Sequence, residues 1–450
     1  MPETTNLNSP WGTTPDSDFV PAGTEPENGL SVEFTGKRGS LFWLALKTGF
    51  FTILTLGFYR FWMKTRLRRW YWSAIRPGGH PMEYVGDPIE KLLGFFIAVV
   101  VLTFYIGIMN LLLMFVSFSV FNSSVIGYVA SFAGVIPIWF YARYRARRYV
   151  LGRTRWRGVR FGLEKGAWGY AFRALWYWFL TIISLGILWP RMTFLLEKYR
   201  TDRTFFGSAR LVQQGRWQML FKAARPLLLS LLVLLAAIIW TFGLDPVFPD
   251  QEEAGTELVQ GLEALFEGRT VTANWENPER LLLIPLALAG MLFGAIWYNW
   301  VSKRIMAQHK VGPGIQFASS LSGARVTLIY VLGNFIAYVV LLLGIMALIL
   351  LAAVAFSDNL ALLTDLPGAD EMSDVPRWLT LSLLGVAYLG FFLLWGVLYN
   401  TFVTFPLMRH MARTTSLPVA LGLPLISQRA RDEFAEAEGF AEALDLGAAI

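Results

Sequence analysis

The stretch FTILTLG at residues 51–57 has a counterpart in LTIISLG at residues 180–186, and this pair decides how the chain is expected to meet a membrane. The two stretches belong to apolar runs at residues 41–59 and 168–189, which are short and interrupted by small and polar residues. They align without a gap, so that Gly57 matches Gly186. Non-helical backbone at membrane depth is tolerated only where protein buries it or water reaches it. We therefore expect both runs to be re-entrant or interfacial segments rather than full crossings.

Both stretches contain a Thr/Ser-Leu-Gly triplet, and a helix can break there because glycine has a weak helix propensity. A proline, which cannot continue a helix, follows the second triplet. The residues expected at the two breaks are Thr55, Gly57, Ser184, Gly186 and Pro190.

The composition of the whole chain is typical of a membrane protein. The chain has 450 residues, of which 55% are hydrophobic and 16% charged, whereas about a quarter of the residues in soluble domains are charged. The absence of cysteine excludes disulfides and thiolate chemistry. A crossing needs about 20 apolar residues. Six runs meet that length: 92–118, 124–142, 223–243, 281–301, 326–356 and 378–405.

The positive charges are gathered between these runs. Of the 39 lysines and arginines, 32 lie in five segments: 60–91, 141–167, 189–225, 302–325 and 406–450. Segments 244–280 and 357–377 are acidic. Because Lys/Arg-rich short loops stay in the cytoplasm, we expect the basic segments and both termini there and the acidic loops outside. A full crossing by residues 168–189 would place one basic segment outside. Eight full crossings, with that single violation, remain the alternative.

Short strand-like motifs recur along the chain. GVRFG at residues 158–162 alternates apolar and polar side chains, with Val159 and Phe161 on one face and Arg160 on the other. Related motifs occur at residues 31–36, 81–86, 204–209, 314–318 and 418–422. Residues 141–161 also align with 297–317, and residues 304–313 with 409–418, so the unit of helix exit, turn and strand repeats. A lone five-residue strand is unstable, which predicts that several pair in a small cytoplasmic β-structure.

These observations predict an all-α polytopic membrane protein with six transmembrane helices, two re-entrant or interfacial helical segments, and short cytoplasmic strands that link the repeats. Residues 1–30 are rich in Thr, Pro and Asn and are expected to be a disordered tail. Residues 31–425 form the membrane domain, and residues 426–450 form an acidic, amphipathic tail.

The chain resembles a known family in two stretches, SVEFTGKRGSLFWLALKTGFFTILTLGFYRFWMKTRLRRWYWS (31–73) and WYWFLTIISLGILWPRM (176–192). They are similar to the YjgN-like family of bacterial inner-membrane proteins, which is defined by a domain of unknown function. The resemblance extends over residues 31–425. It implies an inner-membrane location and no particular activity. The break typical of the family reads Thr-Leu-Gly, whereas the second break in this chain reads Ser-Leu-Gly. The acidic loop 244–280 is an elaboration relative to the family.

Two groups of polar residues are candidate site residues. Asn110 and Asn334 lie deep in predicted crossings, where they either line a solute pathway or hydrogen-bond between helices. Clustered arginines interleave with Trp and Tyr beside the crossings, a composition that anchors helices in anionic headgroups. The expected lipid contacts are Arg66, Arg68, Arg69, Arg145, Arg147 and Arg148. We expect no nucleic acid, and the sequence predicts neither protein partners nor an oligomeric state.

Three functions are compatible with the sequence. Repeats, broken helices and buried Asn favour a transporter or channel for a small solute or lipid. The absence of Asp and Glu from all six runs argues against proton coupling and favours a non-catalytic scaffold or assembly factor. An intramembrane enzyme has no motif behind it, because phosphate-binding, metalloprotease and nucleophile signatures are missing. We therefore expect no enzymatic activity, no cofactor and no metal.

Overall fold

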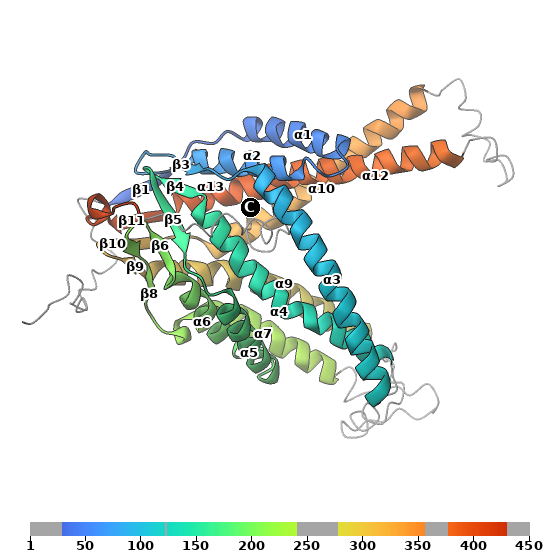
Figure 1. The fold of residues 1–450 in the computed structure, drawn as a ribbon. Coiled ribbons are helices and arrows are strands. Elements are labelled where there is room, and N and C mark those ends of the chain that lie inside the picture. Colours follow the sequence, from blue (N-terminus) through green and yellow to red (C-terminus); the bar gives the residue numbers. More distant parts are fainter. Residues whose placement is uncertain (1–28, 122–123, 241–277, 356–376, 430–450) are drawn as a thin grey trace, which may run out of the picture.

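The computed structural model of the protein describes residues 29–121, 124–240, 278–355 and 377–429. Within them, two antiparallel sheets lie together at one end, and long helices run from the sheets toward the opposite end (Figure 1). The predicted tails 1–30 and 426–450 and the acidic loops 244–280 and 357–377 lie almost entirely outside the described residues.

Within the described residues, five helical stretches are long and apolar enough to cross a membrane. They are Pro88–Val116, Trp217–Ile238, Leu282–Gln308, Gly323–Ala347 and Tyr388–Arg413. The helices that contain them are α3 (Pro88–Phe121), α7 (Phe221–Ile238, preceded by the 3-10 helix Trp217–Leu220), α9 (Pro278–Gln308), α10 (Gly323–Ala355) and α12 (Arg377–Tyr399), the last continuing through a π-helical turn (Asn400–Thr404) into α13 (Phe405–Arg413). Their outer faces are apolar, as Leu111 and Leu292, which are 75% and 69% exposed, illustrate. Such continuous apolar surface is typical of contact with lipid.

Five of the six predicted crossings fall largely within these stretches. The sixth, residues 124–142, forms the first part of helix α4 (Ser124–Gly152), which is not among the five. A sixth crossing therefore stays a prediction.

The two interrupted runs fold as helical hairpins. Helix α1 (Arg38–Leu54) turns and returns as α2 (Arg60–Ala74), and α5 (Ala167–Ile183) turns and returns as α6 (Trp189–Thr201). Pro190 lies in the first turn of α6, where the missing N–H of proline is harmless. The chain thus reverses direction at the end of each run.

The two turns have the same geometry. The Gly57 amide donates to the Thr52 carbonyl oxygen at 2.7 Å, and the Gly186 amide donates to the Thr181 carbonyl oxygen at 2.8 Å. These are the six-to-one bonds of a Schellman helix ending, and the φ angles of the two glycines are 94° and 87°. Glycine is favoured at these two positions because a side chain at such a φ is strained.

The tips of both hairpins are apolar and exposed. Leu56 and Leu185, which precede the two glycines, also have positive φ angles, of 51° and 49°. Their side chains are 86% and 68% exposed. Exposed apolar side chains at both tips favour contact with lipid.

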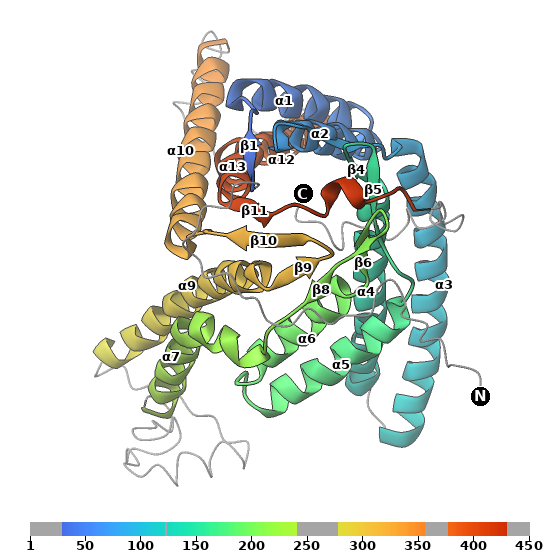
Figure 2. The ribbon, with the colours of Figure 1, turned by 90° about the vertical axis from the view of Figure 1, so that its left-hand side faces the viewer.

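The strands form two sheets. The first sheet has the order β2-β1-β11-β10-β9-β8, and the second has the order β3-β4-β5-β6-β7. The strands are β1 (Leu30–Phe34), β2 (Ile75–Pro77), β3 (Met82–Tyr84), β4 (Thr154–Trp156), β5 (Val159–Leu163), β6 (Thr204–Phe206), β7 (Ala209–Arg210), β8 (Val212–Gln213), β9 (Lys310–Gly312), β10 (Ile315–Ser319) and β11 (Thr415–Val419). Apolar side chains from both sheets line a cavity of about 270 Å³ between them. Viewed from the sheet end, the helices lie around the strands (Figure 2).

The description of the fold as all-α was wrong, although each of the six predicted strand motifs overlaps a strand. Alternation marks the longer strands: in β1, Val32 and Phe34 are buried and Glu33 is exposed. The additional strands β2, β4, β7, β8 and β9 have only two or three residues each, too few to show a period. Strands β4, β7 and β9 form tight hairpins with β5, β6 and β10, whereas β2 and β8 pair with strands distant in sequence.

Residue pairs between neighbouring strands agree with the internal sequence alignments. Val32 pairs with Pro77, and Phe161 pairs with Phe206. The alignment that matches Gly57 with Gly186 carries the first of these pairs onto the second. Likewise, the alignment of residues 141–161 with 297–317 carries the pair Trp156–Val159 onto the pair Gly312–Ile315. Residues matched by sequence therefore also occupy matched places in the sheets.

Candidate functional site

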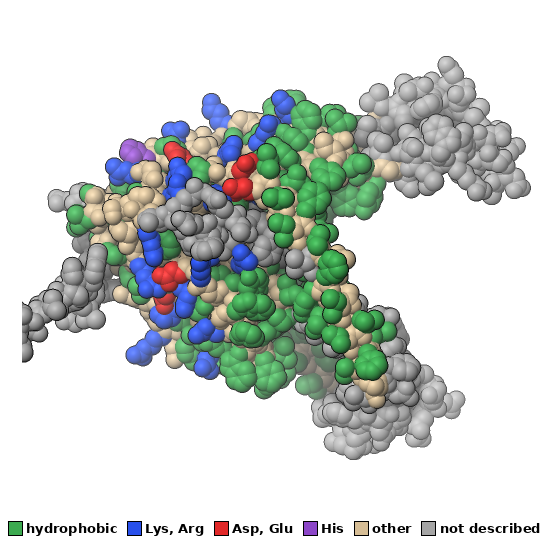
Figure 3. All heavy atoms as spheres, viewed as in Figure 1, with side chains coloured by type: hydrophobic (Ala, Val, Ile, Leu, Met, Phe, Trp, Pro, Cys, Tyr) green, Lys and Arg blue, Asp and Glu red, His purple; other side chains and the backbone are tan. Residues whose placement is uncertain are grey.

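A strongly basic cavity of about 800 Å³ lies among helices α4, α6 and α9 and strands β9 and β10. Six basic side chains and one carboxylate are among the described residues that line it. They are Arg143, Arg147, Arg200, Lys303, Arg304, Lys310 and Glu197. Lysines and arginines also gather on the surface at this end of the molecule, whereas hydrophobic side chains cover the helices (Figure 3).

Helical spacing brings these side chains to one place. Arg143 and Arg147 are four residues apart on α4 and share a face, as do Thr193 and Glu197 on α6. Helix α9 contributes Lys303 near its sheet end. Three helices therefore direct polar faces at each other, and polar groups that face the interior of a helix bundle are costly in a membrane protein.

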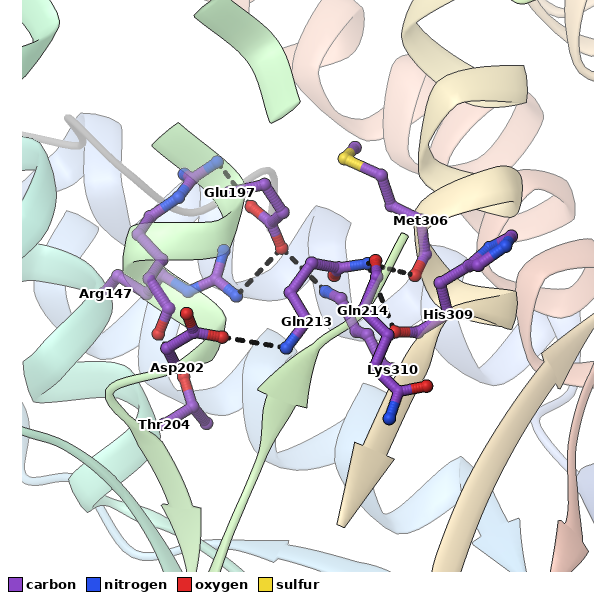
Figure 4. Close-up of polar contacts among 10 residues, drawn as sticks. Arg147, Glu197, Asp202, Thr204, Gln213, Gln214, Met306, His309 and Lys310 are labelled. Atoms are coloured by element: carbon purple, nitrogen blue, oxygen red, sulfur yellow. Dashed lines mark hydrogen bonds and ion pairs between the residues drawn. The ribbon is translucent and has the colours of Figure 1, made fainter. Parts of the chain in front are cut away.

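Glu197 is the centre of an ion-pair cluster (Figure 4). Its carboxylate accepts a hydrogen bond from Nζ of Lys310 at 2.7 Å. The guanidinium of Arg200 lies at 2.5 Å, and that of Arg147 lies farther away, at 3.6 Å. The Glu197 side chain is only 9% exposed, so these cations compensate for its lost hydration.

The cluster fixes the charge of Glu197. Burial by itself would raise the pKa of Glu197, but the neighbouring positive charges outweigh burial and hold that pKa well below the usual range. The cations responsible are Arg200, Lys310 and Arg147. Glu197 is thus ionised at any physiological pH and is not a proton carrier there.

Gln213 joins the cluster to the sheets. Its side chain is fully buried, and its Nε2 donates to the carbonyl oxygens of Met306 at 3.0 Å and His309 at 3.3 Å. Its backbone amide donates to the Asp202 carboxylate at 2.8 Å (Figure 4). The end of α9 is thereby tied to the end of α6, next to Lys310 and Glu197.

Two other cations in the cavity lie against aromatic rings. Among the described residues, Arg143 and Lys303 have no ion-pair partner. The Arg143 guanidinium lies 5.3 Å from the ring centroid of Trp139, and Nζ of Lys303 lies 4.1 Å from that of Trp300. Cation–π contact offsets part of the cost of desolvation but does not neutralise charge. The cavity is therefore suited to an anion.

A second, mostly apolar cavity of about 320 Å³ adjoins the basic one. The two share Arg147, Trp300, Lys303 and Met411. The other residues of this apolar cavity come from α2, α4, α10 and the stretch from α12 to α13, and they are Trp72, Val150, Leu151, Tyr330, Tyr399, Val403, Thr404, Leu407 and Met408. A polar and an apolar compartment thus meet at two cations.

The predicted lipid-contact arginines occupy three different environments. Arg66 and Arg69 are exposed on α2 and Arg145 is half-buried on α4. Arg68 and Arg148 are buried, at 1% and 8% exposure. Arg147 alone of the six lines the basic cavity. A run of arginines on a helix necessarily points in several directions, so composition could not separate these roles.

The other predicted residues lie apart from the cavity. Thr55, Gly57, Ser184 and Gly186 form the two hairpin turns. Asn334 donates from Nδ2 to the Tyr330 carbonyl oxygen of its own helix at 2.7 Å.

Asn110 lies in α3, and its side chain is outside the described residues. No group of three or more His, Asp or Glu residues suited to a metal ion occurs in the described part of the chain.

Sequence reasoning missed Glu197, Arg143, Arg200, Lys303, Arg304 and Lys310 as site residues. A signal for one of them was present, because the alignment of residues 141–161 with 297–317 places Arg147 opposite Lys303. The sequence did not show that α4, α6 and α9 contribute side chains to one cavity.

Comparison with protein families gives one match: residues 29–349 fit the model described as "Bacterial protein of unknown function (DUF898)". That range contains every described residue lining the basic cavity except Met411 and Thr415. Comparisons with curated proteins and with solved structures give no match.

Proposed function

The chain belongs to the YjgN-like (DUF898) family of bacterial proteins of unknown function, and on that premise we propose that it transports a small anionic solute or lipid across the inner membrane. The observation that carries the proposal is the basic cavity, which lies where the candidate membrane helices reach the sheets. Within a membrane protein, buried charges facing a cavity are costly and commonly serve a ligand. The proposed role is non-catalytic.

The proposed topology has six crossings, α3, α4, α7, α9, α10 and α12, with the sheets and both termini in the cytoplasm. The hairpins α1/α2 and α5/α6 enter the membrane from that side and return. Matched turns and exposed apolar tips support this arrangement. A reporter fused at Gly166 is expected to be cytoplasmic and one at Gly261 periplasmic. A periplasmic signal at Gly166 would overturn the re-entrant arrangement.

In this topology the outward arginines contact anionic headgroups at the cytoplasmic face. Arg66 and Arg69 on α2 and Arg145 on α4 are the proposed contacts. We do not propose Arg68 and Arg148 as headgroup contacts, because they are buried.

Reconstitution tests the transport proposal. Purified protein in liposomes is assayed for uptake of radiolabelled glycerol 3-phosphate and dicarboxylates and for transbilayer movement of a fluorescent anionic phospholipid. We expect flux of at least one probe and its loss, by about tenfold or more, in Arg143→Gln/Lys303→Gln. Arg210→Gln is the control, because Arg210 is 57% exposed and pairs with Glu164 away from the cavity. If no probe moves, the transport proposal is wrong.

A non-catalytic scaffold is the second candidate. It is favoured by the absence of Asp and Glu from the six predicted runs, since proton-coupled carriers commonly place a carboxylate there. A phenotype of the deletion strain that Arg143→Gln/Lys303→Gln fully rescues would favour the scaffold.

A further inference from the structure

We propose that the ligand of the basic cavity is a phosphate-bearing lipid, with its phosphate among Arg143, Arg147 and Lys303 and its acyl chain in the adjoining apolar cavity. The inference rests on the proposed function in taking the basic cavity as the ligand site, and it names the ligand class. It is carried by the contact between the two cavities, which share Arg147, Lys303 and Trp300.

The charges in the basic cavity favour an anion from outside the cluster. Among the described lining residues, Glu197 is the single acid, and it is already engaged by Arg200 and Lys310 at 2.5 and 2.7 Å. The contact from Arg147 is longer, at 3.6 Å, so this guanidinium can turn to another oxygen at little loss. A phosphate group accepts several charge-assisted hydrogen bonds at once, as a planar guanidinium and an ammonium together can supply.

The position of the cations points to an amphiphile instead of a free anion. Lys303 and Arg147 lie on the border between the polar and the apolar cavity. On the apolar side they face aromatic and aliphatic side chains that include Tyr330, Leu407 and Met408. A free phosphate would use only the polar side. A lipid would bury its chain against the apolar side and hold its phosphate at the border.

The aromatic rings fit the same arrangement. Trp300 borders both cavities and lies 4.1 Å from Nζ of Lys303. Tryptophan commonly sits where headgroup and chain of a lipid meet, because its ring is apolar and its N–H is polar. Trp300 is 5% exposed and part of a packed cluster, so its position is set by the fold.

Binding in an uncharged detergent, read by tryptophan fluorescence and native mass spectrometry, tests the inference with four probes: lysophosphatidic acid, lysophosphatidylcholine, glycerol 3-phosphate and inorganic phosphate. We expect lysophosphatidic acid to bind at least about tenfold more tightly than each of the others. Equal affinity for lysophosphatidic acid and glycerol 3-phosphate would mean that the ligand is a free anion and would overturn the inference. Preference for lysophosphatidylcholine would also overturn it.

Variants locate the bound probe. Lys303→Gln is expected to weaken lysophosphatidic acid binding about tenfold. Met408→Gln, on the apolar side, should weaken lysophosphatidic acid but leave glycerol 3-phosphate unchanged. Arg210→Gln, an exposed arginine outside both cavities, is the matched control and should change neither. Retained thermal stability of each variant shows that it is folded. If neither Lys303→Gln nor Met408→Gln changes lysophosphatidic acid binding, the lipid site is not here.

The two proposals fail differently. Tight lysophosphatidic acid binding without flux of any probe would leave the lipid site in place and remove transport. Flux of a free anion without preference for the lipid would keep transport and remove the lipid site.

Discussion

The hairpins α1/α2 and α5/α6 have matching turns but opposite charges at one matched, buried position. Under the alignment that matches Gly57 with Gly186, Arg68 of α2 corresponds to Glu197 of α6. The Arg68 guanidinium lies 5.9 Å from the ring of Trp72 and 5.1 Å from that of Tyr84, whose hydroxyl accepts its hydrogen bond at 3.2 Å. Glu197 is instead surrounded by cations.

The difference separates what shapes a hairpin from what it is used for. Glycine and the six-to-one hydrogen bond set the turn in both cases. The residue buried near the end of the returning helix differs between the hairpins. Aromatic side chains lie around Arg68, and basic side chains lie around Glu197. Only the second hairpin therefore borders the basic cavity.

The largest effect should come from removing the negative charge of the second hairpin. Glu197→Gln leaves Arg200, Lys310 and Arg147 without their shared anion in a buried setting, and we expect a loss of about 3 kcal/mol of unfolding free energy. Reversible unfolding in mixed micelles measures it. Glu164→Gln is the control, because its pair with the exposed Arg210 should contribute less than about 0.5 kcal/mol. Equal losses in the two variants would remove Glu197 from the centre of the cluster.

The corresponding change in the first hairpin should have a smaller effect. Arg68→Met keeps a long apolar side chain but loses the contacts with Trp72 and Tyr84, at an expected loss of about 2 kcal/mol. Arg66→Met, on the exposed face of α2, should lose about 0.5 kcal/mol or less. Thermal unfolding in the same micelles measures both losses. A larger loss of unfolding free energy in Arg68→Met than in Glu197→Gln would contradict the expected difference between the two hairpins.

The turns should respond alike. Gly57→Ala and Gly186→Ala force an L side chain to a strained positive φ, and each is expected to lose about 1 kcal/mol. Gly39→Ala in α1 is the control, because its φ is ordinary and the added Cβ meets open space, so it should be neutral or slightly stabilising. Thermal unfolding of the three variants is the measurement. Clearly unequal losses at Gly57 and Gly186 would show that the two turns differ in the folded protein.

The smallest effect should be that of mild acid. The folded-state pKa of Glu197 is depressed, so its stabilising contribution is present above the unfolded-state pKa and is lost only as the pH falls through the folded-state value. From pH 8 to about pH 5 the difference in stability between the wild type and Glu197→Gln should therefore be constant. Below about pH 4 the difference should shrink. Melting temperatures measured across this range check the sign, and a difference that already shrinks between pH 8 and pH 6 would contradict it.

The hairpins and the main strands could be predicted because their signals are local. The Thr/Ser-Leu-Gly triplets mark the turns, and the alternation of Val32, Glu33 and Phe34 marks a strand. The basic cavity could not be predicted, because it exists only where α4, α6 and α9 meet. Arg147 and Arg148 are adjacent in sequence, yet one lines the cavity and the other donates to the Leu163 carbonyl oxygen. Which of these two arginines faces the cavity depends on how helix α4 is rotated about its axis, and composition carries no information about that rotation.

The pairing of β1 with β11 has a consequence for synthesis. Leu30 of β1 pairs with Leu417 of β11, so the first sheet cannot close until residue 417 has left the ribosome. At about 5–20 residues per second, β1 waits on the order of 20–80 s for this partner. The candidate membrane helices are made in the meantime, so insertion precedes closure of the sheet. A nascent chain stopped before residue 415 would present two unpaired strand edges, on β1 and β10, which are templates for pairing with other chains.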